Sequence, residues 1–267
     1  MASNEEKIID FYSNGKENDR SSGLRSNSIE FHYTKKLLSK YISSGSNVIE
    51  LGCATGYYGL FFADLCSHYT GVDISPDNIS IFNEQLISKG ISNIHAVVGD
   101  ATDLSEFADN SFDVVLCLGP MYHLPHKERL KVFDECSRIA RSNAILAFAY
   151  MNRIGVYAGA CVNDNSRDKY PNMTTNKYVF EYSTDDERPG TFLFTSPEEM
   201  EDDAKQKDFE VLKNCGLDFF FASNAIDIMD DEKFNCYLEL ADRMSESRSC
   251  VGLSSHALLI CRKKEDM

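Results

Sequence analysis

The chain lacks any long uninterrupted run of apolar residues. No stretch of its 267 residues approaches the roughly 18 consecutive apolar residues that a membrane-spanning helix needs. The N-terminal stretch MASNEEKIIDFYSNGKENDR also lacks a basic start followed by an apolar segment, which argues against a secretory signal. We therefore expect a cytoplasmic protein with no membrane partner.

Paired cysteines are absent as well. The nine cysteines are scattered along the chain, and no two of them form a CxxC pair. The sequence therefore predicts neither a zinc site nor a disulfide framework, and we expect no metal. Most of the cysteines lie among apolar residues, where a thiol behaves as a small hydrophobic side chain.

Basic side chains are scarce relative to acidic ones. The chain has 27 lysines and arginines against 42 aspartates and glutamates, which gives a net charge of −15. Nucleic-acid binders draw most of their non-specific affinity from a basic surface that neutralises phosphates. The charge balance therefore argues against nucleic acid as a partner and favours a cationic or neutral small-molecule substrate. A local basic patch would still leave RNA open.

What the sequence does contain is a regular alternation of strand and helix patterns. Helices are predicted between consecutive strands, at residues 57–65, 76–89 and 127–141. The predicted buried strands cover residues 47–51, 69–74, 95–100, 112–118 and 143–150. This rhythm predicts an α/β fold with a doubly wound, Rossmann-like sheet that is mostly parallel and carries helices on both faces.

We interpret the chain as four parts. Residues 1–44 form an N-terminal cap segment, whose first 26 residues look mobile and whose helix begins near Ile29. Residues 45–150 form the Rossmann-like core. Residues 151–195 are rich in turn formers and are expected to be an irregular lid or insertion.

The fourth part, residues 196–267, completes the core sheet. A capping box at Ser196 and Glu199 starts a helix that is expected to run to a stop at Gly216. A strand at 217–223, a helix at 230–244 and an antiparallel last strand at 254–263 are predicted to follow.

The stretch VIELGCATGYYGLFFA, residues 48–63, is the first functional signal. Its strand carries a carboxylate, Glu50, and is followed by Gly52 and Gly56 ahead of a helix. Ligands of open α/β sheets bind beyond the carboxyl ends of the strands. Glycines there permit a tight turn and a close approach of ligand to backbone, and the free amides of a helix N-terminus add donors. Taken alone, the loop could also be a turn without a ligand.

Three further strand ends fall on the same predicted edge. The second strand ends at Asp73, 21 residues after Gly52, where a dinucleotide fold places the acid that accepts ribose hydroxyls. The third strand ends near Asp100, and the fourth is broken by Gly119 and Pro120. A single aspartate at a strand end is as often a helix cap as a ligand contact. Four strand ends along one edge are hard to explain as caps alone, and they favour a nucleoside-binding site.

At these residues the sequence resembles class I S-adenosylmethionine-dependent methyltransferases. VIELGCATG is similar to the first motif of the family, GVDIS to the second, GDATDL to the third and FDVVLCLGPMYHL to the fourth. Ala54 replaces the usual middle glycine of the first motif. The LGPMYHL form resembles a bacterial branch that carries an arginine and a glutamate ten residues apart, which here would be Arg20 and Glu30.

The resemblance implies an enzyme that uses S-adenosylmethionine, releases S-adenosylhomocysteine and methylates a small molecule by in-line transfer. It implies that Asp73 accepts both ribose hydroxyls, that Asp100 accepts from the adenine amine, and that Glu50 holds the glycine loop or, through water, the cofactor amine. The other implied cofactor contacts are Gly52, Cys53, Ala54 and Gly56 on the methionine part, Ile74 and Ala101 on adenine, Leu118 and Gly119 under the methionine chain, and Arg25 or Tyr12 closing over the cofactor.

Tyr122 and His123 follow the fourth strand, near the expected position of the methyl group. Because histidine titrates close to neutral pH, His123 is the candidate general base. Tyr122 is expected to orient the substrate or to face the sulfonium with its ring. Both residues could instead simply pack at the start of the next segment.

Two other functions stay open from the sequence. One is a methyltransferase that acts on RNA or protein, and the other is a protein that binds the cofactor without turnover. A nicotinamide enzyme fits less well, because its GxGxxG loop admits a pyrophosphate. Here the glycine spacing is GxxxG, and Cys53 and Ala54 narrow the turn.

Overall fold

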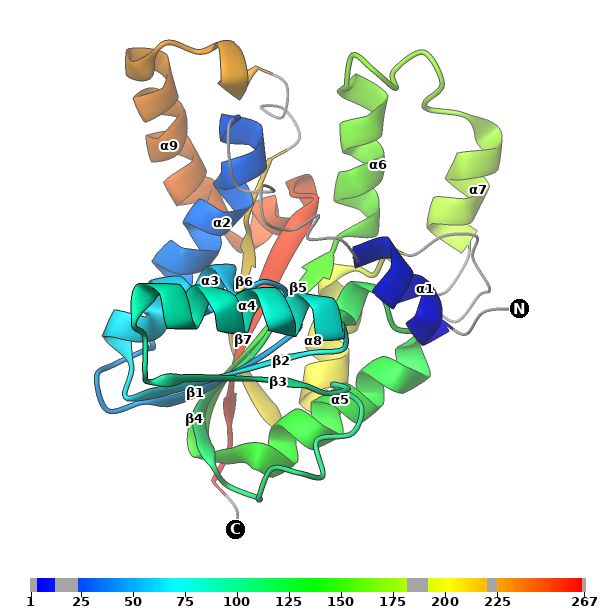
Figure 1. The fold of residues 1–267 in the computed structure, drawn as a ribbon. Helices are drawn as coiled ribbons and strands as arrows, with labels where there is room; N and C mark the ends of the chain where they lie inside the picture. Colours follow the sequence, from blue (N-terminus) through cyan, green and yellow to red (C-terminus); the bar gives the residue numbers. More distant parts are fainter. Residues whose placement is uncertain (1–3, 13–23, 182–191, 220–224, 266–267) are drawn as a thin grey trace.

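A computed structural model of the chain describes residues 4–12, 24–181, 192–219 and 225–265. Seven strands in these residues form one sheet in the order β3-β2-β1-β4-β5-β7-β6 (Figure 1). β1 to β5 run parallel to one another, and β7 runs antiparallel between β5 and β6. The strands are β1 (Asn47–Leu51), β2 (His68–Asp73), β3 (Ile94–Val98), β4 (Phe112–Cys117), β5 (Ala140–Met151), β6 (Phe209–Gly216) and β7 (His256–Lys263). The predicted doubly wound sheet with an antiparallel last strand is confirmed.

Helices cover both faces of the sheet, as Figure 1 shows. One core cluster joins the sheet to α2, α3, α4 and α9, and a second joins its other face to α5 and α8. The helices of the described residues are α1 (Asn4–Tyr12), α2 (Arg25–Leu38), α3 (Tyr57–Phe62), α4 (Pro76–Lys89), α5 (His126–Ile139), α6 (Arg153–Val162), α7 (Met173–Glu181), α8 (Pro197–Gln206) and α9 (Asp231–Ser245). In the part of the chain that the structure describes, no helix is both long and apolar enough to cross a bilayer.

Side-chain caps fix the ends of two helices near the carboxyl edge of the sheet. Ser75 accepts a hydrogen bond from the Asn78 backbone N–H at the start of α4, and Gly90 ends that helix in the left-handed conformation. The predicted capping box of Ser196 and Glu199 is present at the start of α8. Both helix starts lie where the sequence predicts them.

The region after α8 corrects one prediction. The helix expected to reach Gly216 ends at Gln206, and β6 occupies residues 209–216 in place of a strand at 217–223. Asp208 adopts a positive φ of 59° and turns the chain. Apolar side chains recur every three residues from Phe209, which fits a helix, but their antiparallel ladder with β7 selects a strand. Residues 220–223 of the predicted strand lie outside the described residues.

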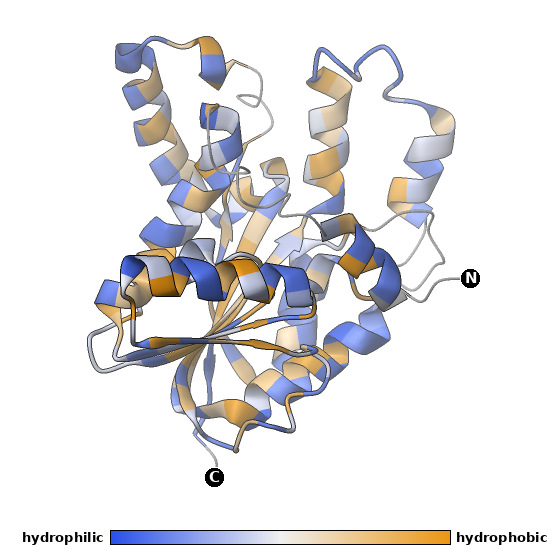
Figure 2. Ribbon diagram, in the orientation of Figure 1, coloured by the Kyte–Doolittle hydropathy of each residue, from blue (hydrophilic) through white to orange (hydrophobic). Residues whose placement is uncertain are grey.

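Two segments expected to be irregular contain helices. α1 forms within the polar N-terminal stretch, and α6 and α7 form within residues 151–195. Asn152 accepts a hydrogen bond from the Ile154 backbone N–H and starts α6. Figure 1 shows that α6 and α7 rise on one side beyond the sheet, while α2 and α9 rise on the other. Figure 2 shows apolar residues alternating with polar ones along these raised helices.

Candidate functional site

A cavity opens at the carboxyl ends of β1, β2, β3 and β4, where the sequence places its motifs. The empty space inside it is about 1110 Å³, including the part open to solvent. Its wall contains most of the predicted cofactor residues: Tyr12, Glu50, Gly52, Cys53, Ala54, Asp73, Ile74, Asp100, Ala101, Leu118 and Gly119. Both predicted catalytic residues, Tyr122 and His123, are also in the wall. The topology therefore gathers four separate strand ends around one space.

The glycine loop after β1 depends on left-handed backbone at three positions. Gly52, Ala54 and Gly56 have φ values of 76°, 46° and 91°. A Cβ on Gly52 would lie 2.9 Å from the Gly119 Cα, so a side chain here would push the β1 and β4 loops apart. Glycine is the residue that meets both demands.

Gly56 differs from its prediction as a cofactor contact. It is not in the cavity wall, and a Cβ at this position would lie 2.1 Å from the ring of Phe82 on α4. The glycine instead lets α3 begin directly against Phe82. Its role in the described structure is the packing of the loop onto α4.

Glu50 is a buried carboxyl group at the floor of the cavity. Only 1% of the residue is exposed, and its Oε2 accepts a hydrogen bond of 2.6 Å from the Tyr69 hydroxyl on β2. Burial raises the pKa of Glu50 to about 8, against the opposing effect of the Tyr69 bond. No sequence pattern singles out Tyr69, because a tyrosine in a buried strand usually belongs to the hydrophobic core.

Asp73 hydrogen-bonds the glycine loop, the turn after β2 and the first turn of α4. Its carboxylate accepts hydrogen bonds from the Ala54 N–H at 2.8 Å, the Ser75 N–H at 2.9 Å and the Asn78 side-chain amide at 3.2 Å. Burial raises the pKa of Asp73, although these three bonds favour its ionised form. Since a carboxylate offers about four acceptor positions, Asp73 retains capacity toward the cavity while holding the glycine loop.

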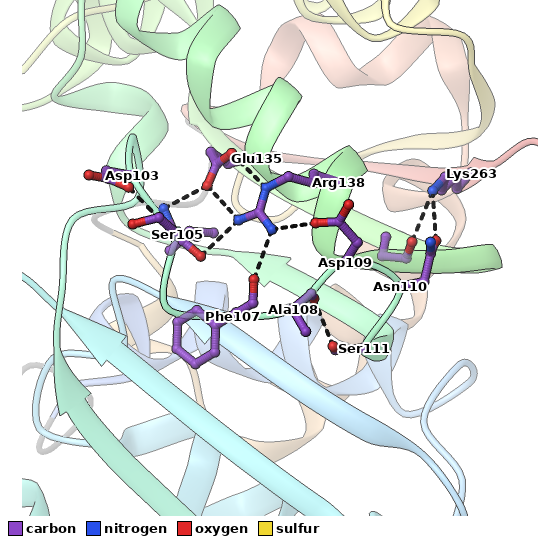
Figure 3. A network of polar contacts seen from close by, with 12 residues as sticks. Asp103, Ser105, Phe107, Ala108, Asp109, Asn110, Ser111, Glu135, Arg138 and Lys263 are labelled. Atoms are coloured by element: carbon purple, nitrogen blue, oxygen red, sulfur yellow. Dashed lines mark hydrogen bonds and ion pairs between the residues drawn. The ribbon is translucent and has the colours of Figure 1, made fainter.

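Asp100 begins a loop that leads from β3 to β4. Its Oδ1 accepts a 2.8 Å hydrogen bond from the Thr102 N–H. Arg138 on α5 holds the later residues of that loop by donating hydrogen bonds to the carbonyls of Leu104 and Phe107. Its guanidinium also pairs with Glu135 (Figure 3). The hydrogen bonds to Glu135 raise the pKa of Arg138, which keeps it charged. The loop bearing Asp100 is therefore fixed to α5.

Two segments that are distant in sequence meet over the cavity at His123. The hydroxyl of Tyr12 on α1 lies 2.9 Å from His123 Nε2. The ring of Phe192 is 5.6 Å from that of Phe11 and 5.1 Å from that of His123, and the Leu193 N–H donates to the Tyr122 carbonyl at 2.7 Å. The N-terminal helix and the segment that precedes α8 thus share one contact point.

The two predicted catalytic side chains are already engaged with the protein. His123 is buried, and its Nε2 faces Tyr12. The Tyr122 hydroxyl donates to the Leu118 carbonyl at 3.1 Å. Both residues line the cavity, and these polar atoms are engaged by the protein.

The prediction that Arg25 closes over the cofactor does not fit its position. Its guanidinium donates to the Met229 carbonyl, pairs with Asp231 at 2.6 Å and stacks on Phe234. These contacts fix the start of α2 to α9 and leave the residue outside the cavity wall. Glu30 does line the cavity, whereas Arg20 lies outside the described residues.

Comparisons with known proteins agree with this geometry. Residues 48–143, slightly more than a third of the chain, match the family model described as a methyltransferase domain. A ubiquinone biosynthesis O-methyltransferase from Hahella chejuensis is 28% identical over 109 residues, which are 41% of this chain and 44% of that protein. A sterol 4-C-methyltransferase from Caenorhabditis elegans is 29% identical over 114 residues, 43% of this chain and 33% of that protein. The chain thus spans less than half the length of either relative.

The fold likeness extends beyond this stretch. A SAM-dependent methyltransferase from Methanosarcina mazei superposes with a TM-score of 0.57 at 18% identity, covering 86% of this chain and 98% of that one. The PH0226 protein from Pyrococcus horikoshii superposes with a TM-score of 0.58 at 20% identity, covering 93% and 99%. The fold is therefore shared over nearly the whole chain.

Residues 48–143 match a methyltransferase domain, and the seven-stranded sheet that contains them has the fold of a solved S-adenosylmethionine-dependent methyltransferase. S-adenosylmethionine is the methyl donor of this family.

Proposed function

We propose that the chain is an S-adenosylmethionine-dependent methyltransferase that acts on a small molecule, and that the cavity described above holds its cofactor. The observation that carries this proposal is the set of carboxyl groups in the cavity wall, among which Glu50 has its pKa raised to about 8. Glu30, Glu50, Asp73 and Asp100 line it, and no lysine or arginine does so in the described part of the chain. S-adenosylmethionine carries a sulfonium and an ammonium against one carboxylate. A cofactor with a pyrophosphate would place its negative charges beside these carboxyl groups without a lysine or arginine to neutralise them, so it fits this cavity less well.

In this proposal the cofactor follows the strand ends in order. Asp73 accepts from the ribose hydroxyls with the capacity its loop contacts leave, and Asp100 accepts from the adenine amine beside Ile74 and Ala101. The glycine loop, with Gly52, Cys53 and Ala54, borders the methionine part. Glu50 faces the ammonium through water, and the nearby positive charge would favour its ionised form.

The reaction is an in-line displacement at the methyl carbon. The new bond forms to the acceptor atom while the carbon–sulfur bond breaks and its electron pair remains on sulfur. The sulfonium is a good leaving group, so the protein contributes chiefly position and orientation. Tyr122 and His123 would border the methyl group with their rings. His123 can act as a base through Nε2 only where the contact of this atom with Tyr12 opens.

We further propose that residues 1–44 and 151–195 form a cover over this site. The supporting observation is that α1 and Phe192 converge on His123, at the mouth of the cavity. A cover of this kind would exclude water from the sulfonium and restrict the acceptor to molecules that fit beneath it. It therefore favours a small acceptor, and the net charge of −15 also argues against RNA.

The names of the curated relatives agree with a small acceptor, since those proteins are named for quinone and sterol methylation. Transfer of the labelled methyl group from S-adenosylmethionine to a metabolite extract would establish turnover. Binding without transfer to any metabolite, RNA or protein fraction would instead support a cofactor-binding protein.

The cofactor assignment is tested by calorimetric titration of S-adenosylhomocysteine into the wild type, Asp73→Asn and Asp113→Asn. Asp113 is the matched control, because it accepts from the Asn47 N–H at the opposite edge of the sheet. We expect Asp73→Asn to weaken binding about tenfold or more, equivalent to about 1.4 kcal/mol, and Asp113→Asn to leave it unchanged. Equal affinities in all three proteins, or binding of NAD instead, would refute the assignment.

A further inference from the structure

A second cavity lies farther along the same edge of the sheet, at Met151, where β5 ends, and at Ser255, just before β7. Its empty space is about 760 Å³, including the part open to solvent. Residues of α2, α6 and α9 line it, and Figure 1 shows α2 and α9 rising beyond the sheet on one side and α6 on the other. The four sequence motifs that resemble the methyltransferase family lie outside this cavity. The resemblance therefore implies no function for it.

The two cavities share a wall on α2. Ser26 and Ile29 line the second cavity, and Glu30 lines the first. These residues have the spacing of neighbours on one side of a helix. Glu30 Oε2 also lies 3.9 Å from Nδ1 of His256. His256 directly follows Ser255, which lines the second cavity. The second cavity therefore adjoins the cofactor site.

Asp218 is the charged group that lines the second cavity. Its carboxylate accepts a 2.7 Å hydrogen bond from the His256 N–H and lies 2.7 Å from Nδ1 of the same residue. Burial alone would raise the pKa of Asp218, but the charge of His256 and these bonds lower it. Ser254 Oγ also lies 2.9 Å from Oδ1, so the carboxylate is held rigidly as the ionised member of a pair with His256 and leaves about one acceptor position for a ligand.

The rest of the wall suits an apolar ligand body. Ile29, Val156, Phe219 and Ile226 contribute apolar surface, and Tyr237 adds an aromatic ring. No lysine or arginine lines this cavity within the described residues, and the neighbouring His256 is paired with Asp218. A carboxylate beside aromatic rings is the setting that stabilises an organic cation.

We propose that the second cavity is the site for the methyl acceptor and that it takes a small organic cation with an apolar body, recognised by Asp218. The acceptor role rests on the proposed function, whereas binding of the cation does not. Glu30 stands between the two sites and extends the acidic surface toward the cofactor. Such a ligand would enter between α6 and the α2–α9 pair.

The probes for this proposal are 2-phenylethylamine, which is cationic at neutral pH, and 2-phenylethanol, its neutral counterpart. Both are titrated by calorimetry into protein saturated with S-adenosylhomocysteine. We expect the amine to bind at least ten times more tightly than the alcohol. Asp218→Asn should remove most of that preference, and Asp231→Asn, at an exposed carboxylate of α9, should keep it.

Asp218 also holds the start of β7, so its substitution could disturb folding. Ala160→Phe provides an independent variant, because it fills the cavity from α6 without touching the carboxylate. It should abolish amine binding and leave the affinity for S-adenosylhomocysteine within about twofold.

Equal binding of amine and alcohol, or undiminished amine binding by Ala160→Phe, would overturn the proposal while the cofactor assignment stands. Amine binding in a protein that does not bind S-adenosylhomocysteine would overturn the proposed function and leave the cation site intact.

Discussion

Replacing Glu50 with glutamine measures how much the ionisation of a buried carboxyl group lowers the free energy of unfolding. The amide oxygen of Glu50→Gln can still accept the hydrogen bond that Tyr69 donates to Glu50 in the wild type. The substitution therefore removes the titration and changes the shape of the side chain little. Its effect on stability should depend on pH in a way that can be worked out in advance.

The folded protein raises the pKa of Glu50 from 4.5 to about 8. Between these values the folded state keeps a proton that the unfolded state releases, so the wild type loses stability as pH rises through this window. The shift of about 3.5 pKa units corresponds to about 5 kcal/mol at about 1.4 kcal/mol per unit. About 3 kcal/mol of that loss should be present at pH 7, and about 1 kcal/mol at pH 5.

The assay is urea unfolding of the cofactor-free protein at a series of pH values from 5 to 9. The free energy of unfolding of Glu50→Gln minus that of the wild type should grow with pH and level off above pH 8. Glu239→Gln, on the exposed face of α9, should track the wild type throughout. A difference between Glu50→Gln and the wild type that is constant with pH would show that Glu50 titrates normally, and the account of the buried carboxyl would be wrong.

Two further predictions concern the glycine loop and the cover. Gly56→Ala should lose about 3 kcal/mol or more in urea unfolding, since its Cβ would overlap Phe82 and its φ is positive. Gly90→Ala, also at positive φ but with open space around its Cβ, should lose only about 1 kcal/mol; equal losses would contradict the packing role. Tyr12→Phe removes the hydroxyl at His123, and should weaken S-adenosylhomocysteine binding about fivefold and speed amide exchange in α1. Unchanged exchange would argue against a cover.

Local signals made some elements predictable to the residue. α4 was predictable because Ser75, Pro76 and Gly90 each act on the backbone next to them. The cofactor edge was predictable for a related reason, since parallel strands place all their carboxyl ends on one side of a sheet. Asp73 and Asp100 therefore meet in the cavity without any information about long-range packing.

Other features depend on partners far away in sequence. β6 has apolar spacing that fits a helix as well as a strand, and its pairing with β7 decides the outcome. The meeting of Tyr12 with His123, and of Asp218 with His256, joins segments that lie far apart in the sequence. Arg25 looked available for a cofactor, but α9 supplies it with other partners. Such contacts arise from tertiary packing, which single-sequence patterns do not encode.

The central claim is that the first cavity binds the nucleoside of S-adenosylmethionine at the carboxyl ends of β2 and β3. The most direct test is a crystal structure of the protein with S-adenosylhomocysteine. The account predicts the ribose hydroxyls within hydrogen-bond distance of the Asp73 carboxylate and the adenine amine beside Asp100. Density for the ligand elsewhere, or an Asp73 carboxylate that contacts only the protein, would contradict it.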